Sequence, residues 1–97
     1  MMTQIEQSAD ELFPELGDLI IEGASTFRIY NFFEERGVDN ENANSILGYL
    51  IRKGKLGGVY HPSGIYLSIG LTPYWKQVIR QKLQEPTNKE LTFPLQK

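Results

Sequence analysis

The chain has 97 residues, a formal net charge of −2, one histidine and no cysteine. This length allows one small domain, and 40% hydrophobic residues with 11% aromatics are enough for a folded core. The lack of cysteine excludes disulfides and thiolate metal sites, and a single histidine excludes a multi-histidine metal site. No stretch approaches the roughly 18 apolar residues of a membrane span, and no charged-then-apolar signal segment opens the chain. We therefore expect a cytoplasmic protein without a membrane span.

Charge is distributed unevenly along the chain. Residues 1–25 contain six acidic residues and no basic residue, whereas the rest of the chain contains ten Lys or Arg against six Asp or Glu. Such asymmetry can mark a binding surface, and the alternative is an acidic helix that lies in solvent.

The first helix is predicted between Ser8 and Gly23, after a disordered segment over residues 1–7. Ser8 and Glu11 have the spacing of a capping box, in which two side chains satisfy free backbone N–H groups. Pro14 lacks an N–H group, so the helix is either kinked there or begins again at that residue.

A second helix is predicted over residues 27–36, capped by Ser25 or Thr26. Its aromatic residues resemble a ligand pocket, but in a domain of this size we interpret them as core. Gly37 ends the helix and leaves only two or three residues before the next one, which favours a helix-turn-helix corner.

The third helix begins near Asp39 or Asn40 and ends at Gly54, and a β-hairpin follows it. The buried stripe at helical spacing is Ala43, Ile46, Leu47, Leu50 and Ile51. Strands are predicted over residues 56–60 and 65–69, on either side of a turn at 61–64. Alternation predicts that Ile65, Leu67 and Ile69 face the core, and the Gly57–Gly58 pair would allow the first strand to bend or bulge where it leaves the helix.

A last helix is predicted over residues 73–84, because Thr72 can cap it and Pro73 suits the first helical position. Its apolar stripe is Trp75, Val78, Ile79 and Leu83. Residues 86–97 are predicted to form a tail.

Residues 26–56, TFRIYNFFEERGVDNENANSILGYLIRKGKL, followed by a hairpin, resemble the winged helix-turn-helix superfamily. The resemblance implies a mainly α, α+β domain over residues 8–85, with a three-helix core, a hairpin wing and an extra C-terminal helix. It also implies that the last helix forms a homodimer contact through Trp75, Val78, Ile79 and Leu83, although this helix could instead fold back over the first helix. Proteins of this architecture bind DNA, RNA or other proteins, so the resemblance specifies fold better than function.

The outward face of the third helix is the candidate binding surface. In a major groove its side chains would reach base edges, with Asn40 or Asn44 on adenine and Arg52 on guanine or phosphate. Gly48 costs about 1 kcal/mol relative to alanine within a helix, which suggests close approach of a DNA backbone or another helix; the alternative is a tolerated local weakness. The full set predicted to contact nucleic acid is Arg28, Asn40, Glu41, Asn44, Ser45, Gly48, Arg52, Lys53, Lys55, His61 and Ser63.

No nucleotide-binding loop, G-x-S-x-G motif or serine–histidine–acid set points to catalysis, so we expect no enzyme activity and no cofactor. The leading hypothesis is a small DNA-binding transcriptional regulator, with the third helix in the major groove of double-stranded DNA and the hairpin on the backbone. The competing hypothesis is a protein–protein adaptor of the same fold, which would not bind DNA. A third is a phage- or plasmid-type inhibitor whose acidic segment mimics nucleic acid.

Overall fold

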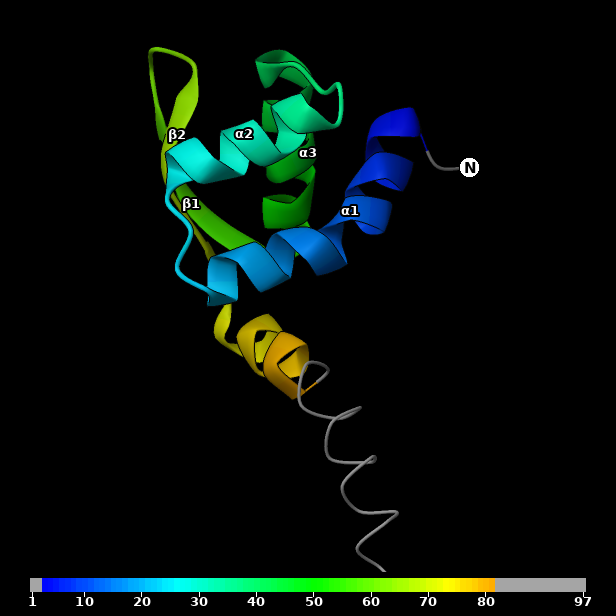
Figure 1. The fold of residues 1–97 in the computed structure, drawn as a ribbon, viewed down its shortest axis with the longest axis vertical. Helices are drawn as coiled ribbons and strands as arrows, with labels where there is room; N and C mark the ends of the chain where they lie inside the picture. Colours follow the sequence, from blue (N-terminus) through cyan, green and yellow to red (C-terminus); the bar gives the residue numbers. More distant parts are fainter. Residues whose placement is uncertain (1–2, 82–97) are drawn as a thin grey trace, which may run out of the picture.

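The computed structural model describes residues 3–81, which form three helices, an antiparallel hairpin and a further helix (Figure 1). The elements are α1 (Gln4–Ile21), α2 (Thr26–Glu35), α3 (Asn40–Arg52), β1 (Leu56–His61) and β2 (Ile65–Leu71), followed by a helix over residues 73–81. The predicted mainly α, α+β class is confirmed, and this topology is compatible with a winged helix. The predictions for Leu83, the last turn of the final helix and the tail over 86–97 lie outside the described residues, as do residues 1–2.

The first helix begins earlier than predicted. Thr3, not Ser8, forms the capping box: its hydroxyl accepts the Glu6 N–H at 3.1 Å, and the Glu6 carboxylate accepts the Thr3 N–H at 3.1 Å. The expectation of disorder through residue 7 is therefore wrong for residues 4–7, which are helical. Burial explains the earlier start, because Ile5 and Ala9, one turn apart, both pack on the core.

Pro14 lies inside α1 and leaves the Asp10 carbonyl without its helical donor. Figure 1 shows that α1 is bent, with its first turns turned away from the direction of its second half. Of the two predicted outcomes, the structure has one kinked helix. The bend allows the start of α1 to approach α3 while the rest of the helix crosses the core.

The helix-turn-helix corner is formed as predicted. Gly37 has a φ of 76°, a conformation that favours glycine, and Asp39 caps α3 by accepting the Asn42 N–H at 2.9 Å. Three of the four aromatic residues of α2 belong to the core as predicted: Phe32 and Phe33 are buried, with ring centroids 5.3 Å apart, and Tyr30 packs against the core. The prediction is wrong for Phe27, which is 74% exposed. The buried hydrophobic core consists of Ala9, Phe13, Leu16, Ile29, Phe32, Phe33, Ala43, Ile46, Leu47, Leu50, Leu56, Leu71 and Ile79.

The hairpin contains a bulge that reverses the predicted alternation. Val59 pairs with Ser68 and Tyr60 pairs with Tyr66, so Leu67 is the extra residue. One extra residue moves every side chain beyond it to the other face. Tyr66 therefore packs on the core, whereas Ile65 and Leu67 are 41% and 55% exposed.

The predictions for Ile65 and Leu67 are thus wrong, while Ile69, on the near side of the bulge, packs against the core as predicted. The bulge also lies in β2, not at the glycine pair of β1. Gly58 has a different role, because a Cβ atom there would lie 2.8 Å from the Ser68 carbonyl oxygen.

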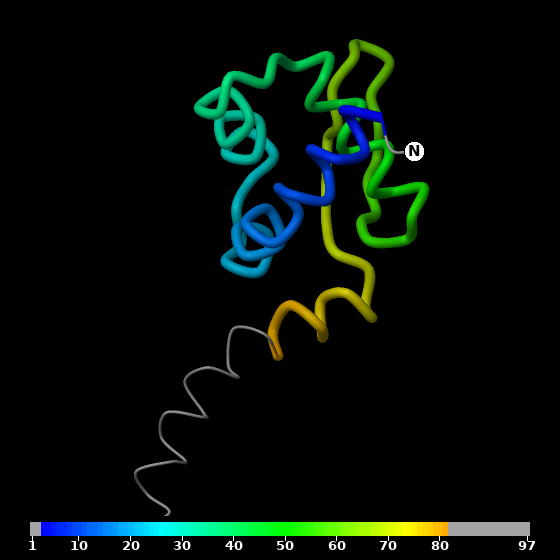
Figure 2. Tube along the Cα trace, turned by 90° about the vertical axis from the view of Figure 1, so that its right-hand side faces the viewer, coloured from blue at the N-terminus to red at the C-terminus, as the bar shows by residue number. Residues whose placement is uncertain are grey.

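The helix over residues 73–81 folds back over α1 (Figure 2). Ile79 is 3% exposed and fits against Gly17, where an added Cβ would lie 3.0 Å from its Cδ1 atom. Trp75 packs edge-on against Phe13, with ring centroids 5.5 Å apart. Ile79, predicted as a dimer contact, is instead buried in the core of its own chain, and the alternative of a helix covering the first helix is confirmed for these residues.

Candidate functional site

The outward face of α3 forms the floor of an open groove. One wall is the first turn of α1, at Thr3, Ile5 and Glu6, and the other is the hairpin, at Tyr60 and Tyr66. The groove holds about 630 Å³. We call this feature the α3 groove; from α3 it is lined by Glu41, Asn44, Ser45, Gly48, Tyr49 and Arg52.

The structure therefore brings together five of the predicted contact residues, Glu41, Asn44, Ser45, Gly48 and Arg52. Helical geometry explains this grouping, because these positions recur at intervals of three or four and share one flank of the helix. Glu41, Ser45 and Arg52 are exposed.

Tyrosines line the groove. Tyr60 and Tyr66 stand edge-to-face with ring centroids 4.9 Å apart, and Tyr49 flanks the groove from α3. The Lys53 ammonium lies 5.9 Å from the Tyr49 ring centroid. Lys53 follows Arg52 at the C-terminal end of α3 but does not itself line the groove. The predicted alternation did not place Tyr66 here, because it did not include the bulge.

Asn44 is occupied within its own chain. Its Oδ1 accepts the Tyr30 hydroxyl proton, and its Nδ2 donates to the Gly64 carbonyl at 2.6 Å. The Tyr30 oxygen in turn accepts the Tyr66 N–H at 2.9 Å, so a chain of hydrogen bonds joins α2, α3 and the hairpin tip. Asn44 thus holds the hairpin wall in place, and its carbonyl and amide are not both free to read an adenine.

The environment of Tyr30 in this network changes the titration of its hydroxyl. Burial raises the pKa of the Tyr30 hydroxyl above its ordinary value of 10.0, and the hydrogen bond donated by the Tyr66 backbone opposes this rise to a lesser extent. The neutral hydroxyl that donates to Asn44 is therefore the stable form at neutral pH.

Nothing within the described residues requires a glycine at position 48. An added Cβ would lie 3.6 Å from both the Tyr66 hydroxyl and the Arg52 guanidinium, which is an ordinary contact distance. The helix has ordinary geometry there, without a positive φ. Among the described residues, no side chain or backbone segment packs closely over Gly48, so the floor of the groove is open there.

The remaining predicted cations are not gathered on this face. Lys55 turns inward, 3.9 Å from an Asp10 carboxylate oxygen and 4.9 Å from the Trp75 ring centroid. Arg28 lies in a separate hollow between α1 and α2. At the hairpin tip His61 is engaged with Ser63, 2.7 Å from its hydroxyl, and Asn40 is the exposed first residue of α3.

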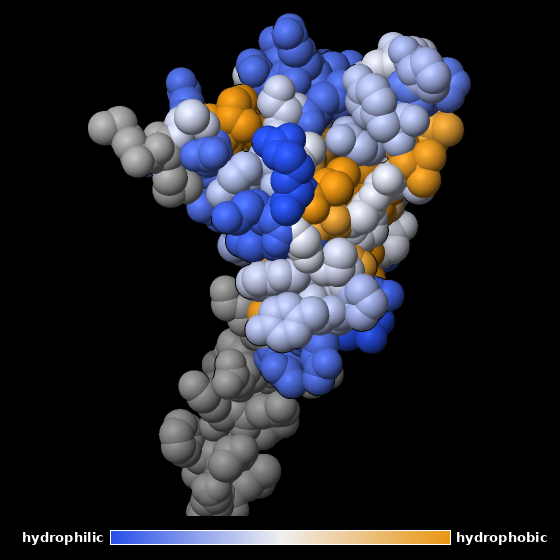
Figure 3. All heavy atoms as spheres, turned by 180° about the vertical axis from the view of Figure 1, so that it is seen from behind, coloured by the Kyte–Doolittle hydropathy of each residue, from blue (hydrophilic) through white to orange (hydrophobic). Residues whose placement is uncertain are grey.

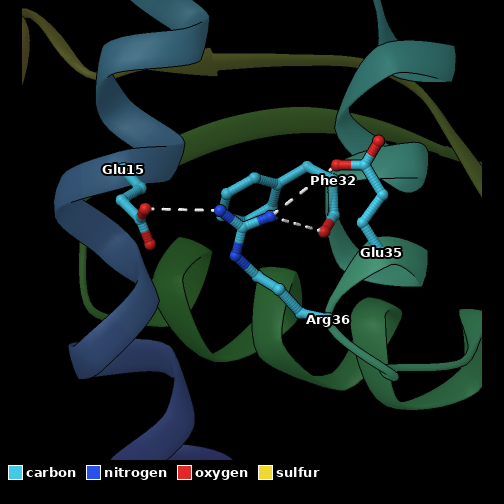
Figure 4. Close-up of polar contacts among 4 residues, drawn as sticks. All are labelled: Glu15, Phe32, Glu35 and Arg36. Carbon is cyan, nitrogen blue, oxygen red and sulfur yellow. Dashed lines mark hydrogen bonds and ion pairs between the residues drawn. The ribbon is translucent and has the colours of Figure 1, made fainter.

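The hollow between α1 and α2 is organised by Arg36, which the sequence did not single out (Figure 4). Its guanidinium stacks 3.8 Å from the Phe32 ring centroid, donates to the Phe32 carbonyl at 3.0 Å and pairs with Glu15 at 3.3 Å. Both this pair and the Lys55–Asp10 pair neutralise part of the acidic run of α1. Arg36, stacked on Phe32 of α2 and paired with Glu15 of α1, therefore joins these two helices.

Within residues 3–81, no group of three or more His, Asp or Glu side chains is arranged to hold a metal ion. None of the helices in the same range is both long and apolar enough to cross a bilayer. Comparison with known protein families, curated proteins and solved structures finds no match to this chain.

Proposed function

We propose that the protein is a non-catalytic binding module that holds a segment of another protein in the α3 groove. The observation that carries this proposal is the composition of the groove, in which tyrosines surround a polar floor with a flat centre at Gly48. Tyrosines bury large area with one polar end and are enriched where proteins meet. A groove with such walls is suited to a short segment of secondary structure.

Charge placement specifies the partner further. Arg52 and Lys53 stand at the C-terminal end of α3, while Glu41 and Glu6 lie toward the other end of the groove. Glu41 and Arg52 are separated by roughly 16 Å along the helix axis, from the 1.5 Å rise per residue. A complementary segment would carry an acidic residue over Arg52 and a basic residue over Glu41, with an apolar residue over Gly48.

Electrostatics disfavours duplex DNA in this groove. Phosphate contacts supply most of the affinity of DNA-binding proteins, but the groove is lined by one cation, Arg52, and two carboxylates, and Lys55 is turned away. The hairpin would be the wing, yet residues 56–75 contain no Lys or Arg. A wing without cations is poorly suited to the DNA backbone.

The test is affinity capture with the 97-residue chain, followed by measurement of its affinity for the purified partner. Gly48→Arg fills the groove floor, and Gln77→Arg adds the same charge on the C-terminal helix, outside the groove. We expect a partner that binds wild type and Gln77→Arg equally and binds Gly48→Arg at least tenfold more weakly. Equal binding to all three would contradict the assignment of the groove.

A second candidate is DNA binding by α3, favoured by the exposed polar row Glu41, Ser45 and Arg52 with Lys53 beside it. If DNA is the ligand, Arg52→Ala with Lys53→Ala should reduce the salt slope by about two phosphate contacts. The control is Lys76→Ala with Arg80→Ala, which removes the same charge from the C-terminal helix. Random-sequence duplex at low salt, followed by a salt titration, distinguishes this candidate from the first.

A further inference from the structure

The side of the hairpin that faces away from the helices carries apolar side chains with no cover among the described residues. Val59, Leu67 and Ile65 are 57%, 55% and 41% exposed. Figure 3 shows hydrophobic atoms gathered on the side of the molecule where the hairpin lies. This exposure is a consequence of the bulge, which directs Leu67 and Ile65 away from the core. We call these residues, with their cross-strand partners Ser68 and His61 and with Gly57 and Gly70, the outer hairpin face.

The outer hairpin face is uncharged. No Asp, Glu, Lys or Arg occurs between Lys55 and Lys76. Natural proteins commonly protect exposed strand edges with charged residues, especially lysine, and neither strand of this hairpin contains Asp, Glu, Lys or Arg. A neutral apolar face also meets its own copy without electrostatic repulsion, whereas it offers nothing to a highly charged partner.

The face has a raised half and a flat half. Val59, Leu67 and Ile65 lie toward the hairpin tip, while Gly57 and Gly70 pair with each other toward the base. A methyl group added at either glycine would meet no atom within 4 Å. A two-fold axis that runs across the strands would place the raised half of each copy over the flat half of the other, which makes the contact isologous.

We propose that the outer hairpin face is a homodimer interface, in which two hairpins stack face to face as a small sandwich. Two stacked hairpins would bury the apolar side chains that each hairpin leaves in water, which is favourable. Ile79 of the C-terminal helix is not available for such a contact, because it is buried in its own chain. The α3 groove stays open in the dimer, since Tyr60 and Tyr66 lie on the other side of the hairpin.

The experiment is sedimentation equilibrium of the full chain from about 1 µM to 1 mM, a range suited to a contact smaller than standard interfaces. We expect the mass of wild type to rise from 11.1 kDa to twice that value. Leu67→Lys should remain at the mass of one chain. Tyr74→Lys changes an exposed aromatic residue of the C-terminal helix, outside the outer hairpin face, and should dimerise as wild type does. Circular dichroism verifies that each variant is folded.

The stacking arrangement has its own test, because the chain contains no cysteine. Leu67→Cys of one copy and Gly70→Cys of the other should form a disulfide when the two variants are mixed and oxidised, in excess of the like pairs. A wild-type chain that stays single throughout, a Leu67→Lys variant that dimerises equally, or no excess of the mixed pair would each overturn the proposal. A mass that rises beyond two chains would also overturn it.

Discussion

At the residue scale, the contacts of Tyr30 explain why the hairpin is held against the helices. Its hydroxyl donates to Asn44 and accepts from Tyr66, and Asn44 donates to Gly64. Three segments distant in sequence are thereby joined by groups that are half-buried. In such an environment a lost partner leaves another polar group unsatisfied.

Removing the Tyr30 hydroxyl should therefore destabilise the fold. We expect Tyr30→Phe to lower the free energy of unfolding by about 1–3 kcal/mol, because the Tyr66 N–H and the Asn44 carbonyl both lose a partner. Urea denaturation measures this change, and amide exchange at residues 64–66 should quicken in the variant. Tyr74→Phe, at an exposed position, is the control; equal stability of wild type and Tyr30→Phe would contradict the role of the network.

The raised pKa of Tyr30 gives a pH dependence with a defined sign. The folded chain holds this proton more tightly than the unfolded chain, so the stabilisation is complete below the ordinary pKa of 10.0 and is lost as the pH rises above it. The difference in unfolding free energy between wild type and Tyr30→Phe should be constant near neutral pH and shrink above about pH 10. A difference that grows in alkaline solution would contradict the assignment.

Two glycines near the groove should respond oppositely to alanine. Gly48→Ala should stabilise the chain by about 0.5–1 kcal/mol, because a methyl group fits and alanine favours helix. Gly58→Ala should destabilise it by about 1–3 kcal/mol, because the methyl group would lie 2.8 Å from the Ser68 carbonyl oxygen. Thermal unfolding of both variants, measured side by side, checks this contrast, and destabilisation by Gly48→Ala would show that the helix needs the glycine.

At the element scale, the sequence predicted the helices and the hairpin because local signals act there. Helical spacing, Asp39 as a cap and Gly37 and Gly54 as ends are features of neighbouring residues. The start of α1 was mispredicted because Thr3–Glu6 and Ser8–Glu11 both fit a capping box, and tertiary burial of Ile5 and Ala9 selects the first.

The bulge at Leu67 and the position of the last helix depend on contacts between distant segments. The order of apolar and polar residues in β2 does not show whether the strand is regular or bulged. The bulge is accompanied by a hydrogen bond between Tyr66 and Tyr30, which is 36 residues away. The predicted α3 residues do line one groove, but Lys55 and Asn44 contact partners on other elements. Tyr60 and Tyr66 were missed as groove residues because the bulge was not predicted.

The docking of the C-terminal helix on α1 should be sensitive to Gly17. A larger side chain at this position meets Ile79, so Gly17→Val should reduce stability by about 1–3 kcal/mol. Trp75, the only tryptophan of the chain, packs on Phe13 and reports the docking by its fluorescence. Glu11→Val, at an exposed position of the same helix, is the control, and an unchanged tryptophan signal and stability in Gly17→Val would contradict this packing.

At the scale of the whole molecule, charge separates the two candidate functions. Residues 3–81 contain ten Asp or Glu and seven Lys or Arg, and two of these cations, Arg36 and Lys55, are paired with α1. A surface of this balance attracts polyanions weakly. This balance of charge is compatible with the proposed partner segment, which would carry an acidic residue at one end and a basic residue at the other to match the two ends of the α3 groove.

The orientation of charge in the groove can be reversed without changing the net charge. The double variant Glu41→Arg with Arg52→Glu exchanges the two ends while the long-range field of the molecule stays nearly the same. The central measurement is the affinity of this variant for the purified protein partner, by titration calorimetry, beside that of wild type. We expect a loss of at least tenfold, and an unchanged affinity would contradict binding of the partner in the α3 groove.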